Sequence, residues 1–268
     1  MKKSRWLDEH DRRYQLDGLQ GRRETAFLGY RQVTPDEKAR YVLRHFNTVA
    51  RRYDLMNTLL SFGIHHLWKQ AAIKMLGLNS GDRVLDVCGG TGDLAVLGGR
   101  AVGPSGLVIV YDINRAMIDA GRGKLTGFAS GKRIWFVQGN AEDLSFPDGS
   151  FDAAMLGFGI RNVPRMDQGF REMYRILKPG GKMLCLEFSK PTAPLFRWLY
   201  DFYSFYIMPL LGEIIVGSRK AYTHLPESIR TFATPDELTA IIEQAGFARI
   251  KTHKLTNGIA VIHMGTKD

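Results

Sequence analysis

The sequence predicts an α/β fold, a doubly wound sheet of seven strands with helices on both faces. Short apolar runs alternate with helix-like segments, which is typical of parallel sheets built from β-α-β units. Two further strand-like runs meet at Asn257-Gly258, a hairpin signal that makes the last strand antiparallel in a mostly parallel sheet. The first run ends in clustered glycines that open a helix, as in Rossmann-like folds. The runs span 83–88, 107–112, 133–138, 152–157, 182–187, 247–254 and 258–265.

The turn after the first strand has the features of a small-ligand site. Val84–Val87 is apolar except for Asp86, and the glycines that follow let backbone N–H groups come close to a ligand. The helix that opens at Gly92 favours a negative group at its N-terminus. Asp112 ends the next strand, about 20 residues past Gly92, where an acid would hold a ribose diol. This spacing argues against glycines that only form a tight turn.

Two ligand classes use such a turn. Gly90-x-Gly92-x-x-Ala95 matches the dinucleotide fingerprint, which is weak alone and which an NAD-dependent enzyme would carry. Asp86 could instead meet the cationic amino group of S-adenosylmethionine. A polar cluster at 139–143 follows the third strand, where an adenine ring could be read. The last two features favour S-adenosylmethionine over NAD.

Composition limits the partners. The chain has 268 residues, with 37 Lys and Arg against 27 Asp and Glu, for a formal net charge of +10. This excess suits a nucleic acid or an anionic membrane surface and does not choose between them. Cys88 and Cys185 lie in apolar runs, so no disulfide is expected and a reducing cytoplasm fits. No His/Cys cluster has zinc spacing, so no metal is expected.

Residues 1–33 are charged and irregular, and we expect a partly disordered arm there before a single domain at 34–268. Residues 1–24 mix both charges and lack the apolar segment of a signal peptide. No run reaches the roughly 18 apolar residues of a spanning helix. We therefore expect a cytoplasmic protein, soluble or peripheral at the inner face of the membrane.

Two segments stand out inside this domain. Residues 34–80 are expected to form a helical cap on the sheet core at 81–268, because Thr34-Pro35-Asp36-Glu37 starts a helix. Residues 191–217 interrupt the core with more aromatic side chains than one face of a helix needs. This insertion is expected to line an apolar substrate channel, to contact lipid headgroups, or to form an extra helix buried against the sheet.

Six segments resemble the ubiquinone/menaquinone biosynthesis C-methyltransferases, from about Gly29 to the C-terminus. Tyr53-Asp54-Leu55-Met56-Asn57 and Gly159-Ile160-Arg161-Asn162-Val163 are specific to that family. The glycine turn and Lys178-Pro179-Gly180-Gly181 are shared by many class I methyltransferases. The resembling segments are 53–57, 61–65, 85–94, 159–163, 173–181 and 186–191.

The resemblance implies methyl transfer from S-adenosyl-L-methionine to a ring carbon of a prenylated hydroquinone. We expect the menaquinone branch, from demethylmenaquinol to menaquinol. A ubiquinone-pathway reaction on 2-methoxy-6-polyprenyl-1,4-benzoquinol is the alternative. Carried over by motif, Thr91 belongs to the glycine turn, Asp112 holds the ribose, and Asn140 with Ala141 lies beside adenine. The predicted cofactor-binding residues are Asp86, Gly90, Thr91, Asp112, Asn140 and Ala141.

The chemistry requires an ionised hydroxyl beside the acceptor carbon, and a phenol of pKa about 10 costs about 4 kcal/mol to ionise at pH 7. Arg161 is the predicted cation beside this oxygen, with an ordinary salt bridge as the alternative. Arginine is a poor proton acceptor, because lowering its pKa from about 12 to about 7 would cost roughly 7 kcal/mol. His65 titrates near neutral pH and is the predicted base. Asn162 and Tyr53 are expected to orient the ring hydroxyls.

Two positions depart from the family pattern. Gly157 stands where many members have Ser, so a polar cofactor contact would be lost or replaced by backbone, and His66 stands where Arg is common. An RNA methyltransferase is a rival, but few cations lie among the aromatics at 196–206, so no nucleic-acid partner is expected. The expected partners are a polyprenyl hydroquinone and a transient membrane surface. An NAD-dependent enzyme, a non-catalytic scaffold and a homodimer stay open.

Overall fold

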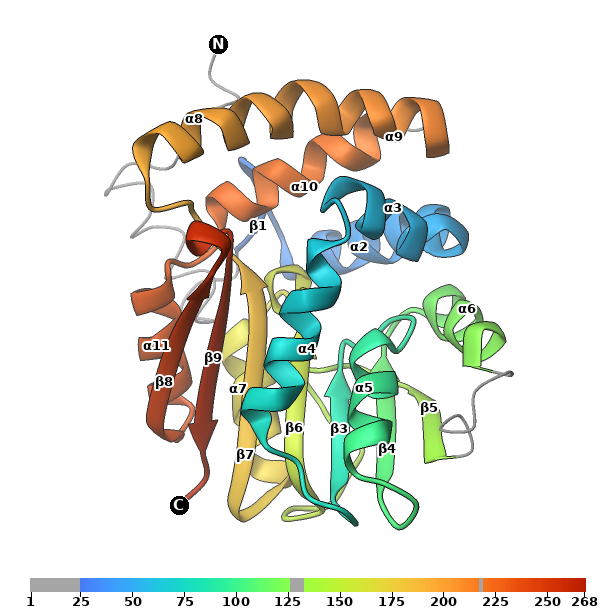
Figure 1. Cartoon of the computed structure of the whole chain (residues 1–268), viewed down its shortest axis with the longest axis vertical. Helices are drawn as coiled ribbons and strands as arrows, with labels where there is room; N and C mark the ends of the chain where they lie inside the picture. The colour runs from blue at the N-terminus through green and yellow to red at the C-terminus, as the bar shows by residue number, and fades with distance from the viewer. Residues whose placement is uncertain (1–24, 126–132, 217–218) are drawn as a thin grey trace.

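The computed structural model describes residues 25–125, 133–216 and 219–268 (Figure 1). A seven-stranded sheet forms its centre, in the order β5-β4-β3-β6-β7-β9-β8. Strands β3 to β7 pair in parallel, and β9 pairs antiparallel with both β7 and β8. The predicted fold class is therefore confirmed. The strands are β3 (Arg83–Val87), β4 (Leu107–Asp112), β5 (Ile134–Gln138), β6 (Phe151–Gly157), β7 (Leu177–Phe188), β8 (Ala248–Leu255) and β9 (Ala260–Thr266).

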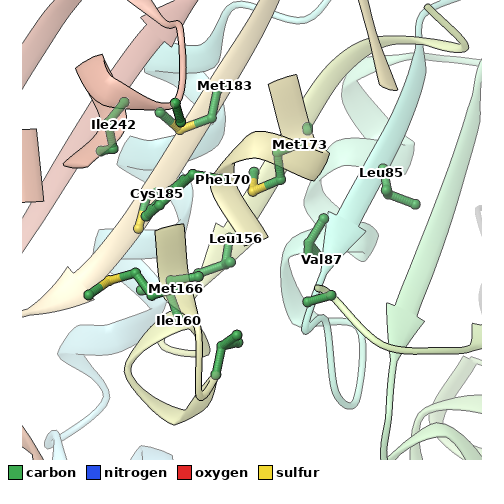
Figure 2. Close-up of a cluster of buried hydrophobic side chains, with 14 of the residues drawn as sticks. Leu85, Val87, Leu156, Ile160, Met166, Phe170, Met173, Met183, Cys185 and Ile242 are labelled. Carbon is green, nitrogen blue, oxygen red and sulfur yellow. The ribbon is translucent and has the colours of Figure 1, made fainter. Parts of the chain in front are cut away.

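Helices cover both faces of this sheet because successive strand residues point to opposite sides. In β3, Leu85 and Val87 belong to one buried apolar cluster and Val84 to another. The first cluster also contains side chains of α7 (Met166–Ile176) and α11 (Pro235–Gln244), and Figure 2 shows Met166, Phe170 and Met173 of α7 within it. The second cluster receives α4 (Ile64–Leu76), α5 (Asp93–Ala101) and the end of α6 (Arg115–Leu125).

The helical cap lies over the carboxyl ends of the parallel strands (Figure 1). It consists of α2 (Pro35–Val49), a 3-10 turn (Ala50–Arg52), α3 (Tyr53–Leu60) and the start of α4. Thr34 caps α2 as predicted: its hydroxyl accepts the Glu37 N–H, and the Glu37 carboxylate accepts the Thr34 N–H. Because the glycine turn follows the carboxyl end of β3, the cap lies above this turn.

The expectation of an irregular arm is wrong for its last residues. β1 (Ala26–Leu28) and β2 (Arg31–Val33) form an antiparallel ribbon. Ala26 and Leu28 are buried, and β1 contacts α2 and α10. Alternating burial of these two apolar residues holds the ribbon in place. Residues 1–24 lie outside the described residues.

The aromatic insertion is helical throughout its described residues from Pro194 to Val216. α8 (Pro194–Phe202), a π-helical turn (Tyr203–Ile207) and α9 (Met208–Val216) run end to end, above α10 (Arg219–Thr231) in Figure 1. Met208 and Tyr222 join Val49, Met56 and Leu60 of the cap in a third buried cluster. The insertion thus packs on the cap. None of the helices in the described ranges is both long and apolar enough to cross a membrane.

Candidate functional site

One cavity collects all six residues predicted to bind the cofactor. It has a volume of about 110 Å³ and lies where β3, β4 and β6 end and where the loop after β5 begins. The strand order reverses between β3 and β6, and ligands of doubly wound folds bind at such a switch point. The predicted residues in its wall are Asp86, Gly90, Thr91, Asp112, Asn140 and Ala141.

Asp86 presents a buried carboxylate with one oxygen unused. Its Oδ2 accepts the Ala95 N–H at 3.1 Å. Its Oδ1 is buried and makes no hydrogen bond among the described residues. Burial raises the pKa of Asp86 to about 8, against the opposing charge of Lys69. A buried oxygen without a partner is costly, so this position fits a ligand that brings a cation or a hydrogen-bond donor.

The glycine turn is shaped around Asp112. The Asp112 Oδ2 accepts the Gly90 N–H at 2.9 Å, and its Oδ1 accepts the Asn114 N–H at 2.8 Å. Burial raises the pKa of this carboxyl. Only glycine fits at position 89, where a Cβ would lie 2.8 Å from the Asp86 carboxyl carbon. Gly89 thus leaves room for the Asp86 carboxyl, and the Gly90 N–H binds the Asp112 carboxylate.

Thr91 links the turn to the cap. Its hydroxyl donates to Asp54 Oδ1 of α3 at 2.6 Å, and Lys124 of α6 bridges to Asp54 Oδ2 at 2.9 Å. Lys124 also pairs with Asp93 at the start of α5, which in turn pairs with Lys69 at 2.5 Å. Burial opposes ionisation of Asp93, but the two lysines hold its pKa below the usual range. Charge pairs therefore fasten the cap to the cofactor cavity.

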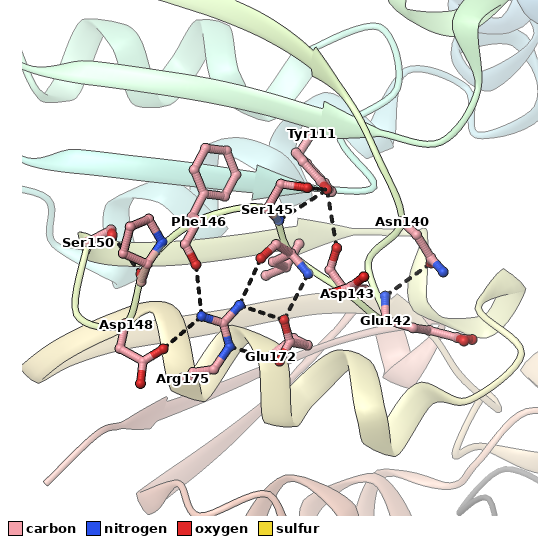
Figure 3. A network of polar contacts seen from close by, with 12 residues as sticks. Tyr111, Asn140, Glu142, Asp143, Ser145, Phe146, Asp148, Ser150, Glu172 and Arg175 are labelled. Atoms are coloured by element: carbon pink, nitrogen blue, oxygen red, sulfur yellow. Dashed lines mark hydrogen bonds and ion pairs between the residues drawn. The ribbon is translucent and has the colours of Figure 1, made fainter.

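A polar network fixes the loop that follows β5 (Figure 3). Arg175 of α7 donates to the carbonyl oxygens of Leu144 and Phe146, both at 2.8 Å. Glu172 accepts the Leu144 N–H at 2.8 Å and pairs with Arg175 at 2.7 Å. This loop begins at Asn140, so α7 positions the predicted adenine side of the cavity. Sequence reasoning missed Glu172 and Arg175, because the loop and α7 are separated by β6.

The departure at Gly157 has a structural account. A Cβ at this position would lie 2.7 Å from Leu94 Cδ1, so Leu94 of α5 fills the space that a serine side chain would take. Gly157 itself lines the cofactor cavity. At this position the wall of the cavity therefore offers backbone atoms and no hydroxyl.

A second cavity of about 400 Å³ adjoins the first and contains all four predicted catalytic residues. Tyr53, Phe158 and Asn162 line both cavities, so the two meet along these side chains. The remaining walls are largely apolar and come from the cap, α8 and α10. The predicted catalytic residues in its wall are Tyr53, His65, Arg161 and Asn162.

Arg161 lies on the short turn Ile160–Asn162 and has a counter-charge. Its Nη1 donates to Glu187 Oε1 of β7 at 2.7 Å and to the Phe158 carbonyl oxygen. Its Nε is buried without a partner among the described residues. Burial raises the pKa of Glu187, while Arg161 lowers it. The salt bridge considered from sequence thus exists, and its arginine lines the cavity.

The expectation that His65 titrates near neutral pH is wrong. Its Nε2 lies 3.1 Å from the Thr58 hydroxyl, and its Nδ1 is buried without a partner among the described residues. Burial, followed by the charges of Lys69 and His66, lowers its pKa to about 4. The fall from 6.5 to about 4 weakens His65 as a proton acceptor by about 3 kcal/mol. Sequence cannot show this, because burial sets it.

The comparisons with known proteins identify the family of this chain. The model of the ubiE/COQ5 methyltransferase family matches residues 33–267. The chain is 47% identical over 245 residues to the ubiquinone/menaquinone biosynthesis C-methyltransferase UbiE of Hahella chejuensis, covering 91% of this chain and 98% of that protein. The enzyme of the same name from Pseudomonas entomophila is 47% identical over 243 residues, covering 91% of this chain and 95% of that protein.

Solved structures show the same fold. A SAM-dependent methyltransferase from Aquifex aeolicus superposes with a TM-score of 0.56 at 18% identity, covering 75% of this chain and 89% of that one. The family model and the relatives at 47% identity confirm the family resemblance found in the sequence and the predicted cofactor. The chain therefore belongs to the ubiE/COQ5 methyltransferase family and is a C-methyltransferase that uses S-adenosyl-L-methionine.

Proposed function

We propose that this protein methylates a ring carbon of a prenylated hydroquinone and converts demethylmenaquinol to menaquinol. One observation carries the proposal: an apolar cavity of about 400 Å³ opens onto the cofactor cavity and has a guanidinium in its wall. An apolar pocket with a few polar groups suits a flat aromatic ring with a hydrocarbon tail. The names of the relatives at 47% identity include both quinone pathways, so the ring itself is the point to test.

In this proposal the cofactor residues divide by chemistry. Asp86 Oδ1 would receive the cofactor's ammonium, Asp112 would hold the ribose, and Asn140 with Ala141 would flank the adenine. Gly90 and Thr91 shape the turn beneath. When bound, the cofactor supplies a methyl group on a sulfonium, a leaving group that is already cationic. The chain's task is to align the two cavities so that the acceptor carbon faces that methyl group.

The residues of the substrate cavity act on the negative charge that develops on the ring oxygen. Arg161 faces the ring oxygen that ionises and stabilises the phenolate with charge-assisted hydrogen bonds. Glu187 positions the guanidinium through the 2.7 Å ion pair. Tyr53 and Asn162, at the junction of the cavities, orient the ring. His65 is neutral at pH 7, and with a pKa of about 4 it is too weak a base to take the proton of a phenol of pKa about 10.

A turnover assay tests the proposal. The protein is incubated with labelled S-adenosyl-L-methionine and, separately, with a reduced demethylmenaquinol and a reduced 2-methoxy-6-polyprenyl-1,4-benzoquinol. We expect label in the solvent extract of the first reaction. Label only with the second would assign the ubiquinone branch instead. Label with neither would reject the proposal.

The cap contact gives a prediction for cofactor binding. Asp54→Asn should raise the cofactor Kd by about 3- to 10-fold, since Asp54 loses the charge that Lys124 and Thr91 share, worth about 1 kcal/mol. Calorimetric titration measures it. Asp119→Asn is the matched control, because Asp119 is exposed and pairs only with α6 residues among those described. Equal affinities in the two variants would contradict a role for the cap.

We also propose that the protein docks on a membrane through α8 and α9. Exposed apolar side chains recur every three or four residues along these helices, and Trp198, Phe202 and Tyr206 stack on one another. Phe62 and Leu199 are exposed and also line the substrate cavity, so the cavity opens beside this surface. A prenyl tail could then stay in the bilayer. The exposed apolar residues of this segment are Leu195, Phe196, Trp198, Leu199, Phe202, Tyr206, Ile207, Leu210 and Ile214.

Vesicle binding tests this surface. The double variant Trp198→Ala/Tyr206→Ala should bind anionic vesicles at least about tenfold more weakly, since each buried aromatic contributes about 1.5 to 3 kcal/mol. Trp135→Ala on β5 is the control, because Trp135 is 61% exposed and Trp198 is 64% exposed. Sedimentation with vesicles gives the partition. Equal loss in both variants would remove the docking surface.

A further inference from the structure

Three side chains form a ring cluster in one wall of the substrate cavity. Tyr41 and His45 come from α2, and His224 comes from α10. The Tyr41 and His224 rings meet edge to face at 5.1 Å between centroids, and the two imidazoles lie 6.1 Å apart. All three residues line the cavity, and neither helix carries a residue of the predicted catalytic set.

The polar atoms of this cluster lack partners. Within the described part of the chain, the two imidazoles and the Tyr41 hydroxyl make no hydrogen bond with the protein. The cavity wall around them is mostly apolar. Polar groups in apolar surroundings are normally satisfied, and each neutral imidazole offers one donor and one acceptor. The three side chains are only half-buried, so their polar atoms are open to a polar group of a ligand in the cavity.

The electrostatic surroundings keep the cluster uncharged. Burial first, and then the charge of Arg161, lowers the pKa of His45 to about 4. Burial, His45 and the cations Arg161 and Lys38 lower the pKa of His224 to about 3. Burial raises the pKa of Tyr41. At neutral pH the three side chains are uncharged, so they can donate and accept hydrogen bonds but cannot form an ion pair with a ligand.

We propose that Tyr41, His45 and His224 bind the second oxygen of a para-dihydroxy aromatic substrate while Arg161 faces the first. This inference rests on the proposed function for the class of ring. A hydroquinone carries two oxygens on opposite sides of its ring, and a single contact leaves the ring free to rotate about it. Two contacts fix which ring carbon faces the cofactor cavity. The cluster is thus a determinant of specificity for rings with two oxygens.

A binding experiment tests the cluster without relying on turnover. Calorimetry under anaerobic conditions compares the Kd of 1,4-dihydroxynaphthalene with that of 1-naphthol, which lacks the second oxygen. We expect the wild-type protein to prefer the diol by at least about tenfold. His45→Phe and His224→Phe should each reduce this preference about 3- to 10-fold, as expected for the loss of one hydrogen bond. The affinity for 1-naphthol should stay unchanged.

Three controls separate this role from folding. Tyr41→Phe removes only a hydroxyl and should lower the preference by a smaller factor. His224→Gln keeps a donor and an acceptor and should retain most of it. Tyr222→Phe, in the same cavity and on the same helix, should leave it intact. A wild-type protein that binds both compounds equally, or a double His45→Phe/His224→Phe variant with the full preference, would overturn the inference. If the wild-type protein prefers the diol but transfers no methyl group to either quinol, the proposed function is rejected and the inference about the cluster stands.

Discussion

Replacing Asp86 with asparagine should weaken binding of S-adenosyl-L-methionine by roughly 30-fold to several thousand-fold. Removal of one partner from a buried, hydrogen-bonded charge pair costs about 2 to 5 kcal/mol. The amide oxygen of the new side chain can still accept the Ala95 N–H that Asp86 Oδ2 now accepts at 3.1 Å, so the start of α5 should stay in place. What the variant loses is the negative charge at the unpartnered Oδ1. Calorimetric titration gives the Kd directly.

The carboxyl of Asp86 should also make the affinity for S-adenosyl-L-methionine depend on pH. Burial raises the pKa of Asp86 to about 8 in the free protein, so the carboxyl is mostly protonated at pH 6 to 7. A cationic ammonium favours the carboxylate, hence binding should release a proton. Affinity should therefore rise with pH, by up to about tenfold per unit, until it levels near pH 8. Titrations in buffers of different ionisation enthalpy count the proton.

The asparagine variant is the control for this pH profile. It has no carboxyl to titrate, so its weaker binding should be flat between pH 6 and 8. A wild-type affinity that does not change over that range, or a slope that survives in Asp86→Asn, would contradict the role given to Asp86.

Replacing Arg161 with methionine should reduce the rate of methyl transfer by about 10²- to 10³-fold, the usual effect of removing a group that stabilises developing negative charge. Cofactor affinity should stay unchanged, because Arg161 lines the substrate cavity and is not among the residues that line the cofactor cavity. Single-turnover measurement with saturating cofactor isolates the chemical step. An Arg161→Lys variant keeps the charge but not the forked geometry, and should recover only part of the rate.

The ion pair with Glu187 complicates a single substitution. Glu187 is 1% exposed, and an unpaired buried carboxylate costs about 3 to 5 kcal/mol of stability. The double variant Arg161→Met/Glu187→Leu removes both charges, so it should recover the thermal stability of the wild type and stay inactive. Recovery of turnover along with stability would show that Arg161 matters for folding and not for the reaction.

The amino-acid sequence by itself was enough for the cofactor side of the site, whose residues lie close to one another along the chain or at the ends of neighbouring strands. The glycine turn, its two acids and the loop at Asn140 belong to strand ends, and parallel strands bring their carboxyl ends to one edge. All six predicted cofactor residues therefore line one cavity. The hairpin at Asn257 was also predictable, because Asn-Gly pairs favour the left-handed backbone conformation that such turns need. Asn257 adopts this conformation, with φ 55°.

Tertiary structure alone decided the chemistry of the substrate side. The pairing of Arg161 with Glu187 and the meeting of His45 with His224 join segments that are far apart in the chain, and no local motif records such contacts. The lowered pKa of His65 and the raised pKa of Asp86 come from burial, which depends on what the cap and the sheet enclose. A sequence specifies which groups can titrate, whereas the packing around them specifies the pH at which they do.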